Sequence, residues 1–422
     1  MTDIKVTTLP SGLRVVTDHI ETVRSASVGL WVGAGTRNEA PEVNGVAHLL
    51  EHMVFKGTER RNAAAIAEAL ETVGGHMNAF TSREVTAFYS RVLAEDVPLA
   101  MDVTADILQN SLFDAEELAR ERSVVLQEIG QANDTPDDII FDHFQTAAFP
   151  DQGLGRPVLG LPDVVSSLPR EAIIAYLRQH YAGPNMVLSA SGLVEHDRIV
   201  EQAAALFGDL PSTPAVPDTP ARYGGGEYRE NKDLEQLHLL LGFDGVGYHD
   251  PDFHAMNVLA TLLGGGMSSR LFQEIREKRG LVYTIHSFSS SYCDSGLFGV
   301  YAGTGGEDAT ELVPVLCDQL MAVTGEVTDE EVERARAQLR AGLVMGMEST
   351  MARCEQAGQQ MLIYGRVLSM EEQLESLAAV DATAVRRVAT RLLSSRPTLG
   401  ALGPASALES YDGIAGRLRH AA

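Results

Sequence analysis

The chain has 422 residues, of which 45% are apolar and 22% are charged. This balance is typical of a soluble globular protein with several domains, and it excludes an intrinsically disordered chain. The formal net charge of -25 argues against nucleic acid or an anionic membrane as a partner, because both repel a strongly acidic surface. The cysteines, Cys293, Cys317 and Cys354, are odd in number and lack Cys-x-x-Cys spacing, so we expect buried thiols in a reducing compartment.

The N-terminal residues alternate between apolar and polar side chains on either side of a turn at Pro10–Gly12, which predicts two strands. No basic region followed by an apolar run is present, so this segment does not have the pattern of a secretory signal. No stretch approaches the roughly 20 apolar residues of a membrane span. We therefore expect a cytoplasmic protein without a membrane partner.

Further along the chain, the same types of element occur twice, about 210 residues apart. Helices are expected to begin at Asp114-Ala-Glu-Glu and at Thr328-Asp-Glu-Glu, because both segments resemble capping boxes. Core strands are expected at Val28–Gly33, Phe88–Leu93, His238–Phe243 and Tyr283–Phe288.

A segment rich in Pro, Gly, Ser and Thr, residues 211–226, divides the chain near its middle and is typical of a linker. Together with the repeated elements, it indicates a domain duplication. We predict an α+β fold of two tandem homologous domains, at residues 1–210 and 227–422. Each domain is expected to have a mixed or antiparallel sheet packed with helices.

A short helix is predicted from Asn44, a plausible N-cap, to Gly57, a plausible stop. His48 and His52 are four residues apart on it, so both imidazoles project from one face, as two ligands of a single zinc ion would. Glu51 lies at the edge of this face, where it can reach a water molecule beside the metal. The ordinary alternative is a His pair on the surface or in a satisfied core, but the register His-x-x-Glu-His is that of zinc peptidases.

A third metal ligand is expected on the helix that follows Asp114. Glu121 and Glu128 are seven residues apart and therefore share a face of this helix. Glu128 stands in the apolar run Val124–Ile129, where burial of an unpaired carboxylate would be costly and a metal would explain it. Glu121 is then expected to accept a hydrogen bond from the free N–H of a ligand histidine.

The string from His48 to Thr58, HLLEHMVFKGT, resembles the motif of the pitrilysin family of zinc peptidases, the inverzincins. The likeness is greatest to the branch that contains the mitochondrial processing peptidase beta subunit and its bacterial relatives. Other family-like segments are residues 75–82, 121–128, 154–160 and 268–283, so the resemblance covers nearly the whole chain.

The resemblance implies a role for individual residues. Zinc, one ion per chain, would be bound by His48, His52 and Glu128, and Glu51 would be the general base. Arg276 and Tyr283 stand where the family has an Arg/Tyr pair that reaches the substrate carbonyl from the second domain. Without the resemblance, the same two residues would be interpreted as a helix-end arginine and a packed strand tyrosine. The edge strand that binds the peptide would contain Asn78, Ala79 and Phe80.

Asp138 and Asp142 stand at the spacing after Glu128 where processing peptidases have two acidic residues that bind an arginine near the cut. They are four residues apart on an expected helix and can converge on one guanidinium group. An ordinary solvated acidic face explains them equally well.

The resemblance also implies the assembly. Two such domains form half of a clamshell chamber, so we expect a homodimer, or a heterodimer with a metal-free homologue. The second domain has apolar residues at Val258–Leu262, where the repeat would place the metal motif, and is expected to be inactive. The predicted function is a zinc endopeptidase acting on short or unfolded peptides, with arginine favoured near the cut. The alternatives are a non-catalytic core or partner subunit and a zinc hydrolase of an unrelated fold.

Overall fold

The structure is a computed structural model that describes residues 3–418. The chain forms two compact units, each with one sheet covered by helices. The first unit takes the chain up to Gly130, Arg156–Thr219 and Val344–Leu368, and the second takes Gln131–Gly155, Pro220–Leu343 and the chain from Ser369 onward. The predicted α+β class with a sheet in each half is confirmed.

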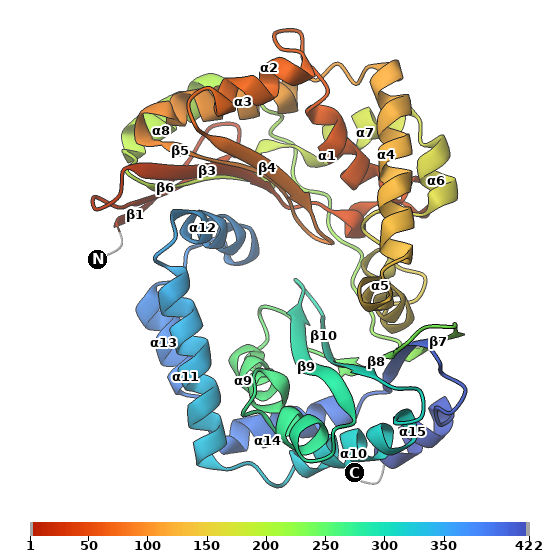
Figure 1. Cartoon of the computed structure of the whole chain (residues 1–422). Coiled ribbons are helices and arrows are strands. Elements are labelled where there is room, and N and C mark those ends of the chain that lie inside the picture. Colours follow the sequence, from red (N-terminus) through yellow and green to blue (C-terminus); the bar gives the residue numbers. More distant parts are fainter. Residues whose placement is uncertain (1–2, 419–422) are drawn as a thin grey trace. The chain divides into compact units, whose positions relative to one another are not determined.

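The first sheet has the strand order β1-β2-β6-β3-β5-β4 (Figure 1). Neighbouring strands are antiparallel except β2 and β6, which are parallel. The strands are β1 Asp3–Thr8, β2 Arg14–His19, β3 Ser25–Val32, β4 His76–Thr81, β5 Thr86–Leu93 and β6 Met186–Gly192. The helices of this unit are α1 Val46–Val54, α2 Ala63–Glu71, α3 Val97–Gln109, α4 Ala115–Asn133 as far as Gly130, α6 Pro162–Ser167, α7 Arg170–His180, α8 His196–Phe207 and α12 Thr350–Tyr364.

The second sheet has the order β7-β11-β8-β10-β9 and repeats five strands of the first sheet with the same directions. Its one parallel pair, β7 and β11, corresponds to β2 and β6. The strands are β7 Gly226–Asn231, β8 Leu237–Asp244, β9 Val282–Ser291, β10 Gly296–Thr304 and β11 Thr398–Gly403. The helices are α5 Pro136–Ala148, α9 Phe253–Gly264, the π-helix η6 Phe272–Glu277, α10 Ala309–Ala322, α11 Asp329–Gly346 as far as Leu343, α13 Met370–Ala378, α14 Ala382–Leu393 and α15 Tyr411–Leu418.

The predicted strands occur where the patterns placed them, and so do the helix starts predicted at Asp114 and Thr328. Thr328 and Glu331 form a reciprocal capping box before α11: the Thr328 N–H donates to Glu331 Oε2 at 3.0 Å, and the Glu331 N–H donates to Thr328 Oγ1 at 3.3 Å. Before α4, Asp114 Oδ1 accepts from the N–H groups of Glu116 and Glu117.

Each sheet is covered on one face by a helix from the opposite half of the chain. Helix α12 packs on β2, β3 and β6, and α5 packs on β7, β8 and β11 (Figure 1). Helix α5 follows α4 and helix α12 follows α11, so α5 and α12 are corresponding elements of the duplication. Each compact unit therefore contains residues from both sides of the linker.

The face of the first sheet under α12 combines an apolar cluster, which includes Trp31 and Val187, with buried serines. Ser27 and Ser189 are fully buried there, and their hydroxyls contact Thr350 Oγ1 at 2.9 Å and the Cys354 carbonyl at 2.7 Å. Gly358 lies so close to Trp31 that a Cβ would stand 2.6 Å from the indole ring. Glycine is required here by this close approach.

The opposite face of the first sheet carries the large apolar core. In β3, the residues Ala26, Val28, Leu30 and Val32 point to one side with period two and pack with α1, α3 and α7 side chains. This core fixes α1 against the sheet, and α1 carries His48, Glu51 and His52.

Candidate metal centre

The helix that carries the histidines is shorter than predicted. Helix α1 begins at Val46 and ends at Val54, with Gly45 as its N-cap in the left-handed region at φ 97°. The predictions of Asn44 as N-cap and Gly57 as the stop were therefore wrong. Asn44 is fully buried and donates from Nδ2 to Glu39 Oε2 at 2.8 Å.

Gly45 has no side chain that could accept hydrogen bonds from the first turn of α1, and Glu39 supplies this side-chain cap instead. Its carboxylate accepts from the Gly45 N–H at 2.9 Å and from the Ala47 N–H at 2.8 Å. A carboxylate at this position satisfies free donors of the first turn and interacts well with the helix dipole. Burial nevertheless raises the pKa of Glu39 to about 7, against the opposing hydrogen bonds. No local sequence signal identified this residue, because it lies in a loop before the helix.

Three side chains converge in the first unit. His48 Nε2 and His52 Nε2 lie 3.7 Å and 3.6 Å from Glu128 Oε2. Their candidate ligand atoms all lie within 4.8 Å of one another. Tetrahedral ligands about 2.05 Å from a zinc ion are separated by about 3.3 Å, so the spacing suits one shared ion.

The electrostatics of the three residues also fit a cation. Burial, followed by the neighbouring His52, lowers the pKa of His48 to about 4, so this imidazole is neutral and able to bind a metal. In residues 3–418 its Nδ1 has no hydrogen-bond partner, and its Nε2 faces the carboxylate. Two imidazoles and one carboxylate with a remaining open position are the ligand set of a catalytic zinc site.

Glu121 orients the second imidazole. Its Oε2 accepts from His52 Nδ1 at 3.0 Å, which leaves His52 Nε2 for the metal. Its Oε1 lies 2.8 Å from Lys56 Nζ, so the buried carboxylate has a charged partner as well. Lys56 was missed by the sequence analysis, although it follows His52 by four residues and lies one turn further along the chain.

Glu128 is not buried as the apolar run suggested. Its side chain is 39% exposed, and Val124 is exposed too. The residues of α4 that face the core are Leu118, Glu121, Val125 and Ile129, which places Glu128 at the border of the buried stripe. The geometry supports Glu128 as a ligand, whereas the argument from burial was wrong.

Glu51 lies beside the candidate metal ligands but is not one of them. Its Oε2 accepts a hydrogen bond of 2.6 Å from Thr81 Oγ1. Burial raises the pKa of Glu51, while the Thr81 hydroxyl and the neighbouring His52 oppose the shift. A half-buried carboxyl with a raised pKa suits proton transfer.

The loop after α1 is fixed by ion pairs. Arg61 donates to Asp106 at 2.6 Å and to Asp102 at 2.5 Å, and Thr58 Oγ1 donates to Asp106 at 2.9 Å. Asp106 is almost fully buried on α3. Helix α1 is therefore anchored at both ends, by Glu39 before it and by this network after it.

Strand β4 is at the end of the first sheet and has one neighbour, β5, within the described part of the chain. It contains Asn78, Ala79 and Phe80, the expected peptide-binding residues. Asn78 is exposed, and its Oδ1 accepts from the Ala79 N–H at 2.9 Å. Beside this strand lies a cavity of about 230 Å³ lined by Phe55, by α2 residues such as Ile66 and Leu70, and by Met77.

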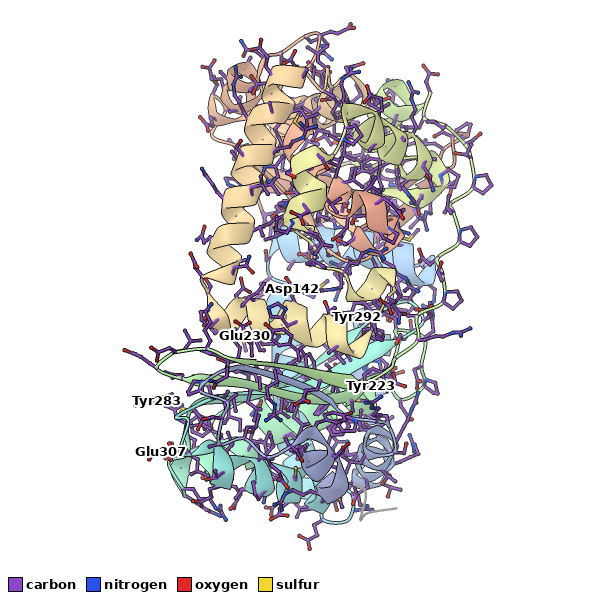
Figure 2. All side chains as sticks on the ribbon, turned by 90° about the vertical axis from the view of Figure 1, so that its right-hand side faces the viewer. Asp142, Tyr223, Glu230, Tyr283, Tyr292 and Glu307 are labelled. Atoms are coloured by element: carbon purple, nitrogen blue, oxygen red, sulfur yellow. The ribbon has the colours of Figure 1, made fainter. Side chains whose placement is uncertain are left out.

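The remaining expected residues lie in the second unit. Arg276 is on η6, with its guanidinium carbon 4.6 Å from the centre of the Phe272 ring, and Tyr283 on β9 is 72% exposed. Asp138 and Asp142 are on α5, where Asp138 is exposed and Asp142 is half-buried. Figure 2 labels Asp142, which is on α5, and Tyr283, which is on β9.

Residues 14–161 match the family described as insulinase (peptidase family M16), and residues 167–339 match the peptidase M16 inactive domain. The chain is 42% identical over 411 residues to an uncharacterized zinc protease of Streptomyces coelicolor, covering 95% of this chain and 90% of the relative. It is 39% identical over 426 residues to a probable mitochondrial-processing peptidase subunit beta of Arabidopsis thaliana, covering 97% of this chain and 80% of the relative. A protease from Helicobacter pylori has the same fold, with a TM-score of 0.89 at 22% identity, over 96% of this chain and 100% of that one.

The chain therefore belongs to peptidase family M16, the pitrilysin family that its motifs indicated. Relatives that cover about 95% of the chain are named zinc proteases, and His48, His52 and Glu128 are placed so that they could hold a metal ion. Among residues 3–418, no helix is both long enough and apolar enough to cross a membrane.

Proposed function

We propose that the protein is a zinc endopeptidase. The observation that carries this proposal is the convergence of His48, His52 and Glu128 with the carboxylate of Glu51 beside them. A structural metal site needs no carboxyl group held next to the ligands, whereas a hydrolase needs a base there.

In the proposed reaction, His48, His52 and Glu128 would hold zinc, which would supply Lewis-acid polarisation of the scissile carbonyl and would lower the pKa of the attacking water toward about 7. Glu51 takes a proton from that water and returns it to the leaving amine. Glu121 keeps the His52 ring in its orientation throughout, because its Oε2 accepts the Nδ1 proton.

The substrate is proposed to be an extended peptide that pairs with the outer edge of β4 at Asn78, Ala79 and Phe80. An edge strand supplies main-chain hydrogen bonds to any extended chain, so the substrate must be short or unfolded. The cavity beside Met77 and Phe55 is lined mostly by apolar side chains but also by Glu71 and His76, and it supports a subsite for one substrate side chain near the cut.

Residues of the second unit complete the proposal. Arg276 and Tyr283 are proposed to donate hydrogen bonds to the oxyanion, a role that the high exposure of Tyr283 supports. Asp138 and Asp142 are proposed to bind an arginine of the substrate, since they lie one turn apart on α5.

For the assembly, we propose a homodimer with one zinc per chain, or a heterodimer with a metal-free homologue. The Arabidopsis relative is named as a subunit, which supports a partner of the same family. Cys317 and Cys354 are buried free thiols, which supports a cytoplasmic location, whereas Cys293 is exposed and the expectation that it is buried was wrong.

The test is hydrolysis of a quenched peptide with an arginine two residues before an apolar residue. Native protein, Glu51→Gln, and native protein treated with chelator and then zinc would be compared. Activity should disappear with the substitution and the chelator and return with zinc. A chain that holds zinc but is inactive with all peptides and with added homologues would be a non-catalytic subunit, and the proposal would fail.

The arginine subsite needs a second comparison. Asp138→Asn with Asp142→Asn should slow cleavage of the arginine peptide but spare a peptide with alanine in its place. A matched control removes two charges elsewhere, at the exposed residues Asp134 and Asp163. Equal slowing in both double variants would mean that only the overall charge matters.

A further inference from the structure

Thr81 is the last residue of β4 and contacts the carboxylate of Glu51, which lies on α1. Side chains of β4 alternate between the two faces of the sheet. Met77 and Ala79 pack into the core that includes α1, and Thr81 follows them with period two. Its hydroxyl is therefore directed to α1 by the strand itself.

The bond is the one hydrogen bond to the Glu51 side chain within residues 3–418. It engages Oε2 and leaves Oε1 free to accept a proton. A glutamate side chain has several rotatable bonds, so without this contact its carboxylate would have no fixed direction. Threonine is a suitable partner because its branched Cβ restricts the hydroxyl to few rotamers.

We infer that Thr81 is a positioning residue that fixes Glu51 relative to the strand on which the peptide binds. This inference rests on the proposed function. Residues Asn78–Phe80, the proposed peptide site, directly precede Thr81 on the same strand. Any movement of that strand moves both the peptide and the group that holds the base, so their separation is preserved. Reactions of this kind are sensitive to small displacements of a catalytic group.

The substitution Thr81→Val tests this because it keeps the shape of the side chain and removes the hydroxyl. We expect kcat to fall about 10-fold with KM within about twofold, since general-base catalysis contributes roughly 10²–10⁴-fold and only its alignment is impaired. Thr81→Ser restores the hydroxyl and should recover kcat to within about threefold of native. The matched control is Thr104→Val, which removes a buried hydroxyl that bonds the Ala100 carbonyl on α3.

Zinc content and the midpoint of thermal unfolding are measured for every variant. The inference is overturned if Thr81→Val matches native kcat, if it changes only KM, or if it loses zinc in proportion to activity. It is also overturned if Thr81→Ser is as slow as Thr81→Val, because the hydroxyl would then not be the relevant group. Failure of the proposed function is recognised separately, since Glu51→Gln would then be as active as native protein or native protein would be inactive.

Discussion

The contact between Glu121 and His52 gives a sharp prediction about metal affinity. Glu121→Gln keeps the size of the side chain but removes its charge. The carboxylate now serves His52 Nδ1 at 3.0 Å and Lys56 Nζ at 2.8 Å with separate oxygens. The amide has only one oxygen, so one of these two donors loses its acceptor in a buried place.

The size of the effect follows from the role of such outer partners. Loss of a hydrogen bond to a ligand histidine costs roughly 10–100-fold in metal affinity, which corresponds to about 1.4–2.7 kcal/mol. We expect the Kd for zinc to rise by this factor in Glu121→Gln. Lys56→Met should have a smaller effect in the same direction, because it acts through the Glu121 carboxylate.

The assay is a competition titration against a chromophoric zinc chelator at constant pH. The control is Glu117→Gln, one turn earlier on α4, whose carboxylate contacts the exposed Arg120. A zinc Kd for Glu121→Gln within about threefold of the control would refute the reasoning, because Glu121 would then not orient a metal ligand.

Three further outcomes are expected. First, the folded pKa of His48 is about 4 against an ordinary 6.5, so the folded state binds fewer protons in this range. Its contribution to the free energy of unfolding of zinc-free protein is complete above pH 6.5 and is lost as the pH falls through 4, a change of about 3 kcal/mol. Urea unfolding of native protein and of His48→Gln, both with chelator, measures this change. Parallel pH profiles of the two proteins would contradict the prediction. Second, Gly358→Val should lower the free energy of unfolding by about 1–3 kcal/mol because its Cβ would meet Trp31, and an unchanged urea midpoint would show that α12 is not held there. Third, Arg353→Met leaves Asp18, which is 2% exposed, without its paired guanidinium. We expect the free energy of unfolding to fall by about 3–5 kcal/mol and to be partly restored by Asp18→Asn in the same chain. Equal stability of the single and double variants would count against this pair.

Much of the metal centre could be predicted because it depends on local geometry. His48 and His52 meet on one helix through their spacing of four residues, and Glu121 and Glu128 share a face through their spacing of seven. These relations hold in any α-helix, wherever it packs. The same is true of the capping box at Thr328, which the chain forms within four residues.

Contacts between distant segments could not be predicted in this way. Nothing near Glu39 indicates that it caps α1, and nothing near Thr81 indicates that its hydroxyl meets Glu51. Likewise, the burial of Glu128 was misjudged because the apolar run of α4 is buried on one stripe only. The direction of each of these side chains depends on how strands and helices pack.

The amino-acid pattern alone was sufficient for the class of fold, the duplication and the metal motif, because period-two and period-3.6 patterns and short spacings are local properties. Only tertiary packing decided that α12 covers the first sheet and that α5 covers the second. Both are helices with apolar and polar faces, and either sheet offers a face to cover. Which face each helix covers depends on close complementarity, such as Gly358 against Trp31 and Arg353 against Asp18, between residues that are far apart in the chain.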